Sequence, residues 1–411
     1  MSAELDSSRW VVDSPALGTT LSARPCRAPD QPDPAPPGGS VAPIALTFSG
    51  GGFRATLAAL GVIRLLADIG RLRDVRYVSS VSGGSVSNAL LAKAWPDLRS
   101  RGFTSAAVDE LVIGPAVGRV STQSLKMSLI KGIWRTVGPM TRTELLARRF
   151  DEWFLDGLRL EHLDEEVRWI VNAANLTTGV RFRFERDVLG DYVIGLTGTA
   201  GTRTKLSLAV AASAAVPGAF APVVLKRVSF PCAQQAPVLV DGGAYDNTGL
   251  QALDREKYRD VFLVSLNAGG LLRPGAYGRI PLVRELARAN SLLYRQSTGL
   301  RTRAMVERFR RGREIDAGMP LPPGARRGLL VALATDFMST SGKLPDWRAT
   351  FPEHRTYRGR DLALVPTVFD KLDGELCRAL VYRGWWLVGA ALAAYWPDRL
   401  PDLTDIKPPT I

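Results

Sequence analysis

The feature that most constrains the fold is a repeated order of apolar run, glycine-containing turn and helix within the first hundred residues. The run "IALTF" at Ile44–Phe48 is followed by three glycines and a helical stretch from about Arg54 to Ile69. The run "VRYVSS" at Val75–Ser80 leads into a second glycine turn and a second helical stretch. Strands that alternate with helices are typical of a mostly parallel sheet with helices on both faces, so we predict an α/β fold.

The domain boundaries follow from changes in composition along the chain. Proline is dense before residue 43 and no hydrophobic period is visible there, so we predict a poorly ordered tail over 1–43. Residues 44–400 are predicted to form one domain, followed by a short tail at 401–411. Within this domain, about 98–163 is expected to be helical, either as a lid or insert or, as the more frequent case, packed against the core. Residues 281–396 are expected to form a helical C-terminal part.

Further elements are expected from apolar periodicity. The last apolar stretch, "GWWLVGAALAAYW" at 384–396, is too short to span a bilayer and is interpreted as a helix that faces the core. The other expected elements are two strands joined by a turn within 168–187, a small-residue helix from 206 that stops near Pro217, a strand ending before Asp241, the strands "DVFLVSLNAGG" and "RRGLLVALATDF", a long helix over 281–313 and closing helices over 362–396.

The chain is strongly basic, with a formal net charge of +13 that comes mainly from arginine. A basic protein is attracted to anionic membranes and to polyanions. The densest basic segment is Arg301–Glu314, in which Met305, Val306 and Phe309 are expected to face inward. We interpret it as the solvated face of a packed helix, with contact to anionic lipid as the next alternative and nucleic acid as the last.

The cysteine usage favours a reducing compartment. Cys26, Cys232 and Cys377 lie far apart, and no CxxC motif is present. This pattern suggests neither a disulfide framework nor a zinc site. The first residues also lack the basic and apolar regions of a signal peptide. We therefore expect a cytoplasmic protein, with peripheral membrane contact as an addition, and we predict no metal and no cofactor.

A candidate nucleophile lies in "SVSGGS" at the end of the second predicted strand. Ser82 is the central serine, at a point where a strand turns directly into a helix. A nucleophile elbow has this context, because a tight turn pushes the serine hydroxyl out of the sheet. Such a turn needs small neighbours, which here are Ser80, Gly83 and Gly84. Ser80 stands where glycine is usual.

The candidate base is an aspartate. The chain has two histidines, His162 in an acidic stretch and His354 in a polar loop, and neither follows a strand with turn residues around it. Asp241 does end a β-rich run and is followed by Gly242 and Gly243. Because active sites of open α/β sheets gather at the carboxyl ends of strands, Asp241 could meet Ser82 there. An Asp-Gly-Gly turn without chemistry is the alternative.

The glycine triplet Gly50, Gly51 and Gly52 sits between a strand and a helix N-terminus. Its amides are suited to an oxyanion hole, which needs N–H donors aimed at a developing negative charge. Arg54 would add positive charge nearby. A phosphate-binding loop is the rival interpretation, but neither GxGxxG nor GxxxxGK[ST] occurs here, and a plain tight turn is the simplest alternative.

Four motifs taken together resemble the patatin-like phospholipase family and, more distantly, the mammalian cytosolic phospholipase A enzymes. "SGGGFR" looks like the family's oxyanion loop, "SVSGGS" its nucleophile elbow, "DGG" its catalytic aspartate motif, and "AASAAVPGAFAPV" the helix and turn that precede this aspartate. They cover roughly residues 44–250. The resemblance implies a three-layer fold and a Ser82–Asp241 dyad without histidine, with Gly84 and Gly243 supporting the two turns.

The activity that the resemblance implies is lipid acyl hydrolysis of the phospholipase A or lysophospholipase type. The expected partners are a phospholipid or another acyl-ester lipid and an anionic membrane surface. A catalytically silent lipid- or membrane-binding protein on the same fold is the alternative. In either case Arg54 is expected to support the loop or to contact a lipid phosphate.

Overall fold

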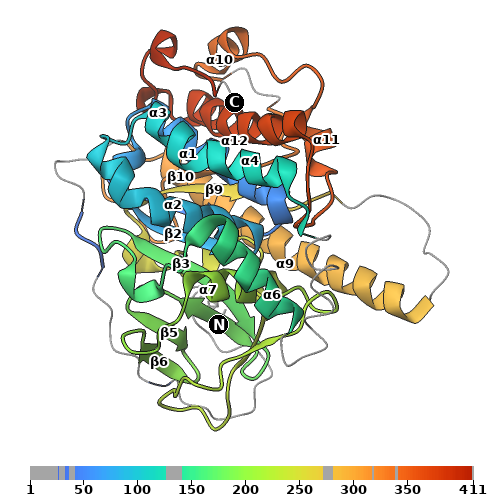
Figure 1. Ribbon diagram of the computed structural model, residues 1–411. Coiled ribbons are helices and arrows are strands. Elements are labelled where there is room, and N and C mark those ends of the chain that lie inside the picture. The colour runs from blue at the N-terminus through green and yellow to red at the C-terminus, as the bar shows by residue number, and fades with distance from the viewer. Residues whose placement is uncertain are drawn as a thin grey trace.

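The computed structural model describes residues 26, 33–36, 42–125, 141–271, 281–316, 319–337 and 341–409, with the backbone alone for 281–290. Its centre is a ten-stranded sheet whose main path runs in the order β10-β9-β1-β2-β3-β4-β5-β6 (Figure 1). The strands are β1 Ile44–Phe48, β2 Val75–Val81, β3 Arg168–Asn175, β4 Val180–Phe184, β5 Val188–Asp191, β6 Gly195–Gly198, β7 Val223–Val224, β8 Val238–Asp241, β9 Phe262–Asn267 and β10 Gly328–Ala332.

The sheet has a parallel part and an antiparallel part. Strands β10, β9, β1, β2 and β3 are parallel to one another. Strands β4, β5 and β6 continue the sheet as antiparallel neighbours, and β7 and β8 pair antiparallel beside β3. The predicted α/β fold with a mostly parallel central sheet is therefore confirmed.

The two faces of the sheet carry different parts of the core. Along β1, the side chains of Ile44, Leu46 and Phe48 belong to the main hydrophobic core, whereas Ala45 belongs to a second, smaller core. This alternation is what a strand buried on both faces requires. Helices α1, α2 and α12 fill the first core, and the C-terminal part of α9 covers the second through Met305 and Phe309.

The helices agree with the expected order along the chain, with shifts at their ends. They are α1 Gly52–Asp68, α2 Gly83–Ser100, α3 Ser105–Val108, α4 Gly114–Thr122, α6 Arg142–Phe150, α7 Leu206–Ser213, α8 Gly243–Asp246, α9 Pro281–Arg313, α10 Leu344–Thr350, α11 Gly359–Ala363 and α12 Gly374–Tyr395. Single turns of 3₁₀ or π helix are η2 Leu72–Asp74, η3 Asp109–Ile113, η5 Asp151–Leu155, η6 Leu160–His162, η7 Leu250–Ala252, η8 Glu256–Tyr258, η9 Pro397–Arg399 and η10 Leu403–Asp405.

Two helical regions can be compared with the expectations from the sequence. Within 98–163, the described part packs onto the main core through residues such as Val112 and Phe150, while 126–140 lies outside the described residues. The apolar stretch near the C-terminus lies in α12, whose Trp385 and Trp386 are fully buried, as predicted for a helix that faces the core. In the part of the chain that the structure describes, no helix is both long and apolar enough to cross a membrane.

One prediction for α9 is wrong. Met305 and Phe309 are buried as expected, but the side chain of Val306 is 46% exposed. Val306 follows Met305 by one residue, which turns its side chain about 100° around the helix and out of the buried face.

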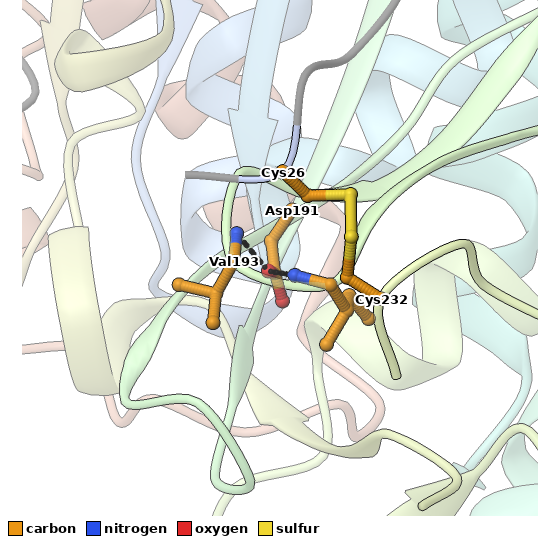
Figure 2. Close-up of a disulfide and its surroundings, with 5 residues drawn as sticks. Cys26, Asp191, Val193 and Cys232 are labelled. Atoms are coloured by element: carbon orange, nitrogen blue, oxygen red, sulfur yellow. Dashed lines mark hydrogen bonds between the residues drawn. A yellow bond between two sulfur atoms is a disulfide. The ribbon is translucent and has the colours of Figure 1, made fainter. Parts of the chain in front are cut away.

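The cysteine prediction is also wrong, because Cys26 and Cys232 form a disulfide (Figure 2). The backbone brings both cysteines to the turn between β5 and β6, where the amide of Cys26 donates to the carbonyl of Tyr192 and that of Cys232 to the carbonyl of Ile194. The buried carboxylate of Asp191 holds this turn by accepting from the amide of Val193. The pairing was missed because cysteines far apart in sequence carry no local signal of their pairing.

Residues of the predicted N-terminal tail that the structure describes are anchored to the domain. Besides the disulfide, the carbonyl of Ala35 accepts a hydrogen bond from Arg76, and Asp33 forms ion pairs with Arg168 and Lys257. For these described residues the expectation of a poorly ordered tail does not hold. The remaining residues of 1–41 lie outside the described part of the chain.

We expect the Cys26–Cys232 disulfide to stabilise the fold by about 2–4 kcal/mol, because it restricts the unfolded chain across a long loop. The test is chemical denaturation of the wild type and of a Cys26→Ser, Cys232→Ser variant, each with and without a reductant. The reductant should lower the denaturation midpoint of the wild type only. A wild type that is insensitive to the reductant would contradict the pairing.

Candidate active site

The register of three strands brings Ser82 and Asp241 together. Strand β2 pairs with β3 as far as Val81, which lies opposite Asn172. The next residue of β3, Ala173, pairs with Asp241 at the end of β8. Strands β2 and β8 thus meet end to end along the same edge of β3. Ser82, the first residue after β2, and Asp241, the last of β8, lie at this meeting point.

Ser82 has the backbone of a strained turn. It lies between β2 and α2 with φ 50° and ψ −118°, and its side chain is buried. A positive φ is uncommon for a residue with a Cβ, and such conformations cluster at functional sites. The sharp strand-to-helix turn is the local geometry predicted for a nucleophile elbow.

The carboxylate of Asp241 is buried and hydrogen-bonded. Its Oδ1 accepts from the amide of Gly243 at 2.7 Å, and the side chain of Ser82 also stabilises the ionised carboxylate. Burial raises the pKa of Asp241 to about 6, and these interactions oppose the rise by stabilising the ionised form. At neutral pH the group is therefore mostly ionised but able to take up a proton, as a general base requires.

The three glycines of the loop differ in their hydrogen bonding. The amide of Gly50 donates to the carbonyl of Asn247 at 3.0 Å, and that of Phe53 donates to the carbonyl of Val368. Across the described residues, the amides of Gly51 and Gly52 have no acceptor. Two N–H groups are thus available beside Ser82, whereas the third predicted donor, Gly50, is already engaged.

The N-termini of two helices converge at this point. Helix α1 begins at Gly52 and helix α2 at Gly83. The two ends are in close contact, because a Cβ added to Gly83 would lie 2.1 Å from the carbonyl oxygen of Gly52. Since each helix N-terminus carries a partial positive charge, their convergence favours an anion next to Ser82.

Arg54 is committed to protein acceptors. Its side chain is 1% exposed and donates to the carbonyls of Ala268 and Val365 and to the hydroxyl of Thr367. Burial lowers the pKa of Arg54 to about 10. The guanidinium therefore joins the glycine loop to a distant segment near residue 366, and this geometry favours loop support over contact with a lipid phosphate.

The two predicted supporting glycines lie in close contacts of the site. Gly84, in the first turn of α2, packs against the backbone of Phe48 at the end of β1. Gly243 donates its amide to Asp241 and lies against the ring of Tyr294. Both positions leave no room for a larger residue without movement of a neighbour.

Ser213 is a positioning residue that sequence reasoning missed. Its hydroxyl accepts from the amide of Ser82 at 2.9 Å and donates to the carbonyl of Asn172 at 2.6 Å. Its own carbonyl accepts from the amide of Gly242. Ser213 therefore connects the turn of Ser82 to the turn that follows Asp241. The signal was the small-residue motif around it, in which this serine is the one hydrogen-bonding side chain.

Neither histidine makes a described contact with Ser82. His162 is exposed in the short helix η6. The Nδ1 atom of His354 accepts from the amides of Thr356 and Tyr357 in its own loop. Among the described residues, no group of three or more His, Cys, Asp or Glu side chains could hold a metal ion.

Tyr294 of α9 is a second residue that sequence reasoning missed. Its hydroxyl donates to Oδ1 of Asp241 at 3.4 Å. Burial, together with the neighbouring carboxylate of Asp241, raises the pKa of Tyr294 well above its usual range, so the hydroxyl stays protonated and acts as a donor. Its position on a long helix in an arginine-rich segment gave no sequence signal for this contact.

Replacing Tyr294 with phenylalanine should move the acidic limb of the pH–rate profile to higher pH. The hydrogen bond from Tyr294 lowers the pKa of Asp241, whereas burial raises it. Without this hydrogen bond the effect of burial is larger, and the pKa of Asp241 rises. The measurement is kcat/KM for a soluble ester across the pH range. A matched control is Tyr245→Phe, because the hydroxyl of Tyr245 accepts from the side chain of Gln251. A limb that stays in place or moves to lower pH would contradict the assigned contact.

Comparison with known proteins identifies the family. Residues 46–254, half of the chain, match the model of the patatin-like phospholipase family, and the chain belongs to this family. A search of curated proteins finds no match.

Among solved structures, human GIVD cytosolic phospholipase A2 is similar with a TM-score of 0.50 and 14% identity, over 85% of this chain and 61% of that chain. The same enzyme in complex with methyl gamma-linolenyl fluorophosphonate has a TM-score of 0.49 and 15% identity, over 85% of this chain and 58% of that chain. At these identities the likeness shows the fold alone. The present chain covers about three-fifths of the length of the human protein.

Proposed function

We propose that this protein hydrolyses fatty-acyl esters of phospholipids or lysophospholipids through a Ser82–Asp241 dyad. The observation that carries the proposal is the meeting of Ser82, in a strained turn, with the buried Asp241 where β2 and β8 end beside β3. The family supports the lipid substrate class. The free amides of Gly51 and Gly52 and the two helix N-termini beside them supply the electrostatics that an acyl transfer needs.

In the acylation step, Asp241 accepts the proton of the Ser82 hydroxyl while Oγ attacks the ester carbonyl carbon. The carbonyl oxygen becomes an oxyanion, which accepts hydrogen bonds from the amides of Gly51 and Gly52. As the tetrahedral intermediate collapses, the C–O bond to the alcohol breaks, and Asp241 returns its proton to the leaving oxygen. The products are the alcohol and an acyl-serine.

In the deacylation step, Asp241 takes a proton from a water molecule, which attacks the acyl-serine carbonyl. The same amides stabilise the second oxyanion. Collapse of this intermediate breaks the bond to Oγ of Ser82, which regains its proton from Asp241, and the fatty acid leaves. One carboxylate with a pKa near 6 can serve both steps because it gains and loses a proton at neutral pH.

The net charge of +13 supports contact with an anionic membrane surface. Binding of nucleic acid by the arginine-rich segment is less supported, because Arg308 pairs with Asp254 while Arg310 and Arg311 pair with Glu307. The Cys26–Cys232 disulfide favours an oxidising compartment over the cytoplasm.

The alternative function is a lipid-binding protein on the same fold without catalysis. A fluorophosphonate probe separates the two, because it reacts with an activated serine. We expect labelling at Ser82 in the wild type and in Ser87→Ala, but not in Ser82→Ala. Ser87 is a buried serine of α2, the helix that follows Ser82, and its hydroxyl donates to the carbonyl of Thr56. Purified wild type should release fatty acid from a lysophospholipid, with a loss of about 10⁴-fold or more in Ser82→Ala. An unlabelled wild type, or undiminished release by Ser82→Ala, would overturn the proposal.

A further inference from the structure

Helix α9 joins the candidate active site to an exposed surface. It is 33 residues long, and its amino-terminal end extends beyond the rest of the molecule (orange in Figure 1). Farther along, the helix packs on the body: Tyr294 contacts Asp241, Arg301 lies 4.0 Å from the carboxylate of Asp246, and Met305 lies in the second core. The helix therefore passes directly beside the catalytic aspartate.

The outward face of α9 is apolar where it passes the site. The side chains of Leu292, Leu293 and Leu300 are 55%, 66% and 60% exposed. Leu293 and Leu300 are seven residues apart and share a face, with Leu292 beside it. Single exposed leucines are ordinary, but three on one helix face next to a candidate site indicate a surface that is covered in function.

The same part of α9 also carries exposed positive charge. Of the arginines in 291–313, Arg301, Arg308, Arg310 and Arg311 lie within ion-pair distance of carboxylates. Arg295 and Arg303 are exposed, and none of the described residues places a carboxylate within ion-pair distance of either. A covering partner must therefore offer both apolar groups and negative charge. A second copy of this helix face offers apolar groups but no negative charge, because its arginines would repel those of the first copy.

We propose that α9 is the element that docks this protein on an anionic phospholipid bilayer. Leu292, Leu293 and Leu300 enter the acyl boundary, and Arg295 and Arg303 contact the headgroup phosphates. This inference rests on the proposed function, for which it names the interface. Tyr294, which touches Asp241, follows Leu293 in the same helix, so a docked α9 places the membrane surface close to the dyad.

The test is cosedimentation with vesicles of phosphatidylcholine and phosphatidylglycerol, and with vesicles of phosphatidylcholine alone. The Leu292→Ser, Leu293→Ser variant should bind the anionic vesicles about tenfold or more weakly than the wild type. Arg303→Gln should bind about fivefold more weakly, with a smaller dependence on salt. The matched control is Met319→Ser. Met319 is 58% exposed, and its carbonyl accepts from Arg327 just before β10. It therefore lies at the amino ends of the parallel strands, whereas the site lies at their carboxyl ends, so this variant should bind like the wild type.

A second measurement separates this inference from the proposed function. Hydrolysis of a soluble short-chain ester such as p-nitrophenyl butyrate should be equal in the wild type and the double leucine variant, while hydrolysis of vesicle lipid falls with binding. If no form hydrolyses either substrate, the proposed function fails and vesicle binding still tests the docking. Unchanged vesicle binding by the double variant would overturn the docking proposal. An equal loss of vesicle binding in Met319→Ser would also overturn it. The same holds if light scattering shows a dimer of the wild type that the leucine substitutions abolish.

Discussion

Replacing Asp241 with asparagine should lower kcat/KM for ester hydrolysis by about 10²–10⁴-fold, the range attributed to a general base. The amide oxygen of asparagine can still accept from Gly243 and Tyr294, so the turn keeps its shape. The amide cannot take up the proton of Ser82, so the attack on the ester loses its base. The measurement is kcat/KM on a soluble ester at a pH well above 6, where the wild-type carboxylate is ionised.

The same substitution should remove a pH dependence of stability. Burial raises the pKa of Asp241 from 3.8 to about 6, so between these values the folded state holds a proton that the unfolded state has lost. Stability therefore falls as the pH rises through this window, by up to about 3 kcal/mol in total. Asp241→Asn has no such group, and its free energy of unfolding relative to that of the wild type should increase from pH 4 to pH 6.

The control for both measurements is Asp246→Asn. Asp246 is equally buried, but its carboxylate accepts from the amides of Thr248 and Gln251 and caps the following turn. This variant should lose stability and keep most of its activity per folded molecule. Equal loss of activity in the two variants, or full activity in Asp241→Asn, would show that Asp241 is not the base.

The local elements of the site could be predicted because their signals are local. An apolar run, a glycine turn and a helix are read from neighbouring residues, so the strands before Gly50 and Ser82 were found with their order correct. The remaining errors are at the ends: α1 begins at Gly52 rather than near Arg54, and β2 extends to Val81. End positions depend on capping and pairing, which reach beyond the local pattern.

The meeting of Ser82 with Asp241 was predicted for a partly different reason. The expectation used the rule that active sites lie at the carboxyl ends of parallel strands. In the structure β8 is antiparallel to β3. It pairs with the part of β3 that lies beyond the end of β2, so Asp241 still lies next to Ser82. Strand direction depends on pairing between segments that are distant in sequence, and the apolar pattern of β8 is the same in either direction.

The features that sequence reasoning missed are all contacts between distant segments. Tyr294 reaches Asp241 from a helix, Val365 and Thr367 accept from Arg54, and Cys26 pairs with Cys232. Tyr294, Val365, Thr367 and the two cysteines stand in no motif, and each has an ordinary neighbourhood in the sequence. Their partners are chosen by the packing of the whole domain, so one sequence carries no separate signal for them.

Replacing Gly52 with alanine should lower kcat by about 10²–10³-fold, the cost of losing one oxyanion donor. Gly52 has φ +60°, and an added Cβ would lie 2.3 Å from the carbonyl oxygen of Val368. Both the left-handed backbone and this contact oppose alanine, so the loop must shift and its amide loses its aim at the oxyanion. The shift should also separate the amide of Phe53 from the carbonyl of Val368, which lie 3.0 Å apart.

Gly70→Ala is a matched control for this substitution. Gly70 follows α1 with a similar φ of +67°, but no atom lies within 4 Å of an added Cβ. Its replacement should cost about 1 kcal/mol of stability from the left-handed backbone alone and leave kcat unchanged. The measurements are kcat on a soluble ester and thermal unfolding of both variants. If Gly52→Ala folds and keeps a kcat within a few-fold of that of Gly70→Ala, the oxyanion does not bind at this loop, and the amides at the start of α2 become the donors to test.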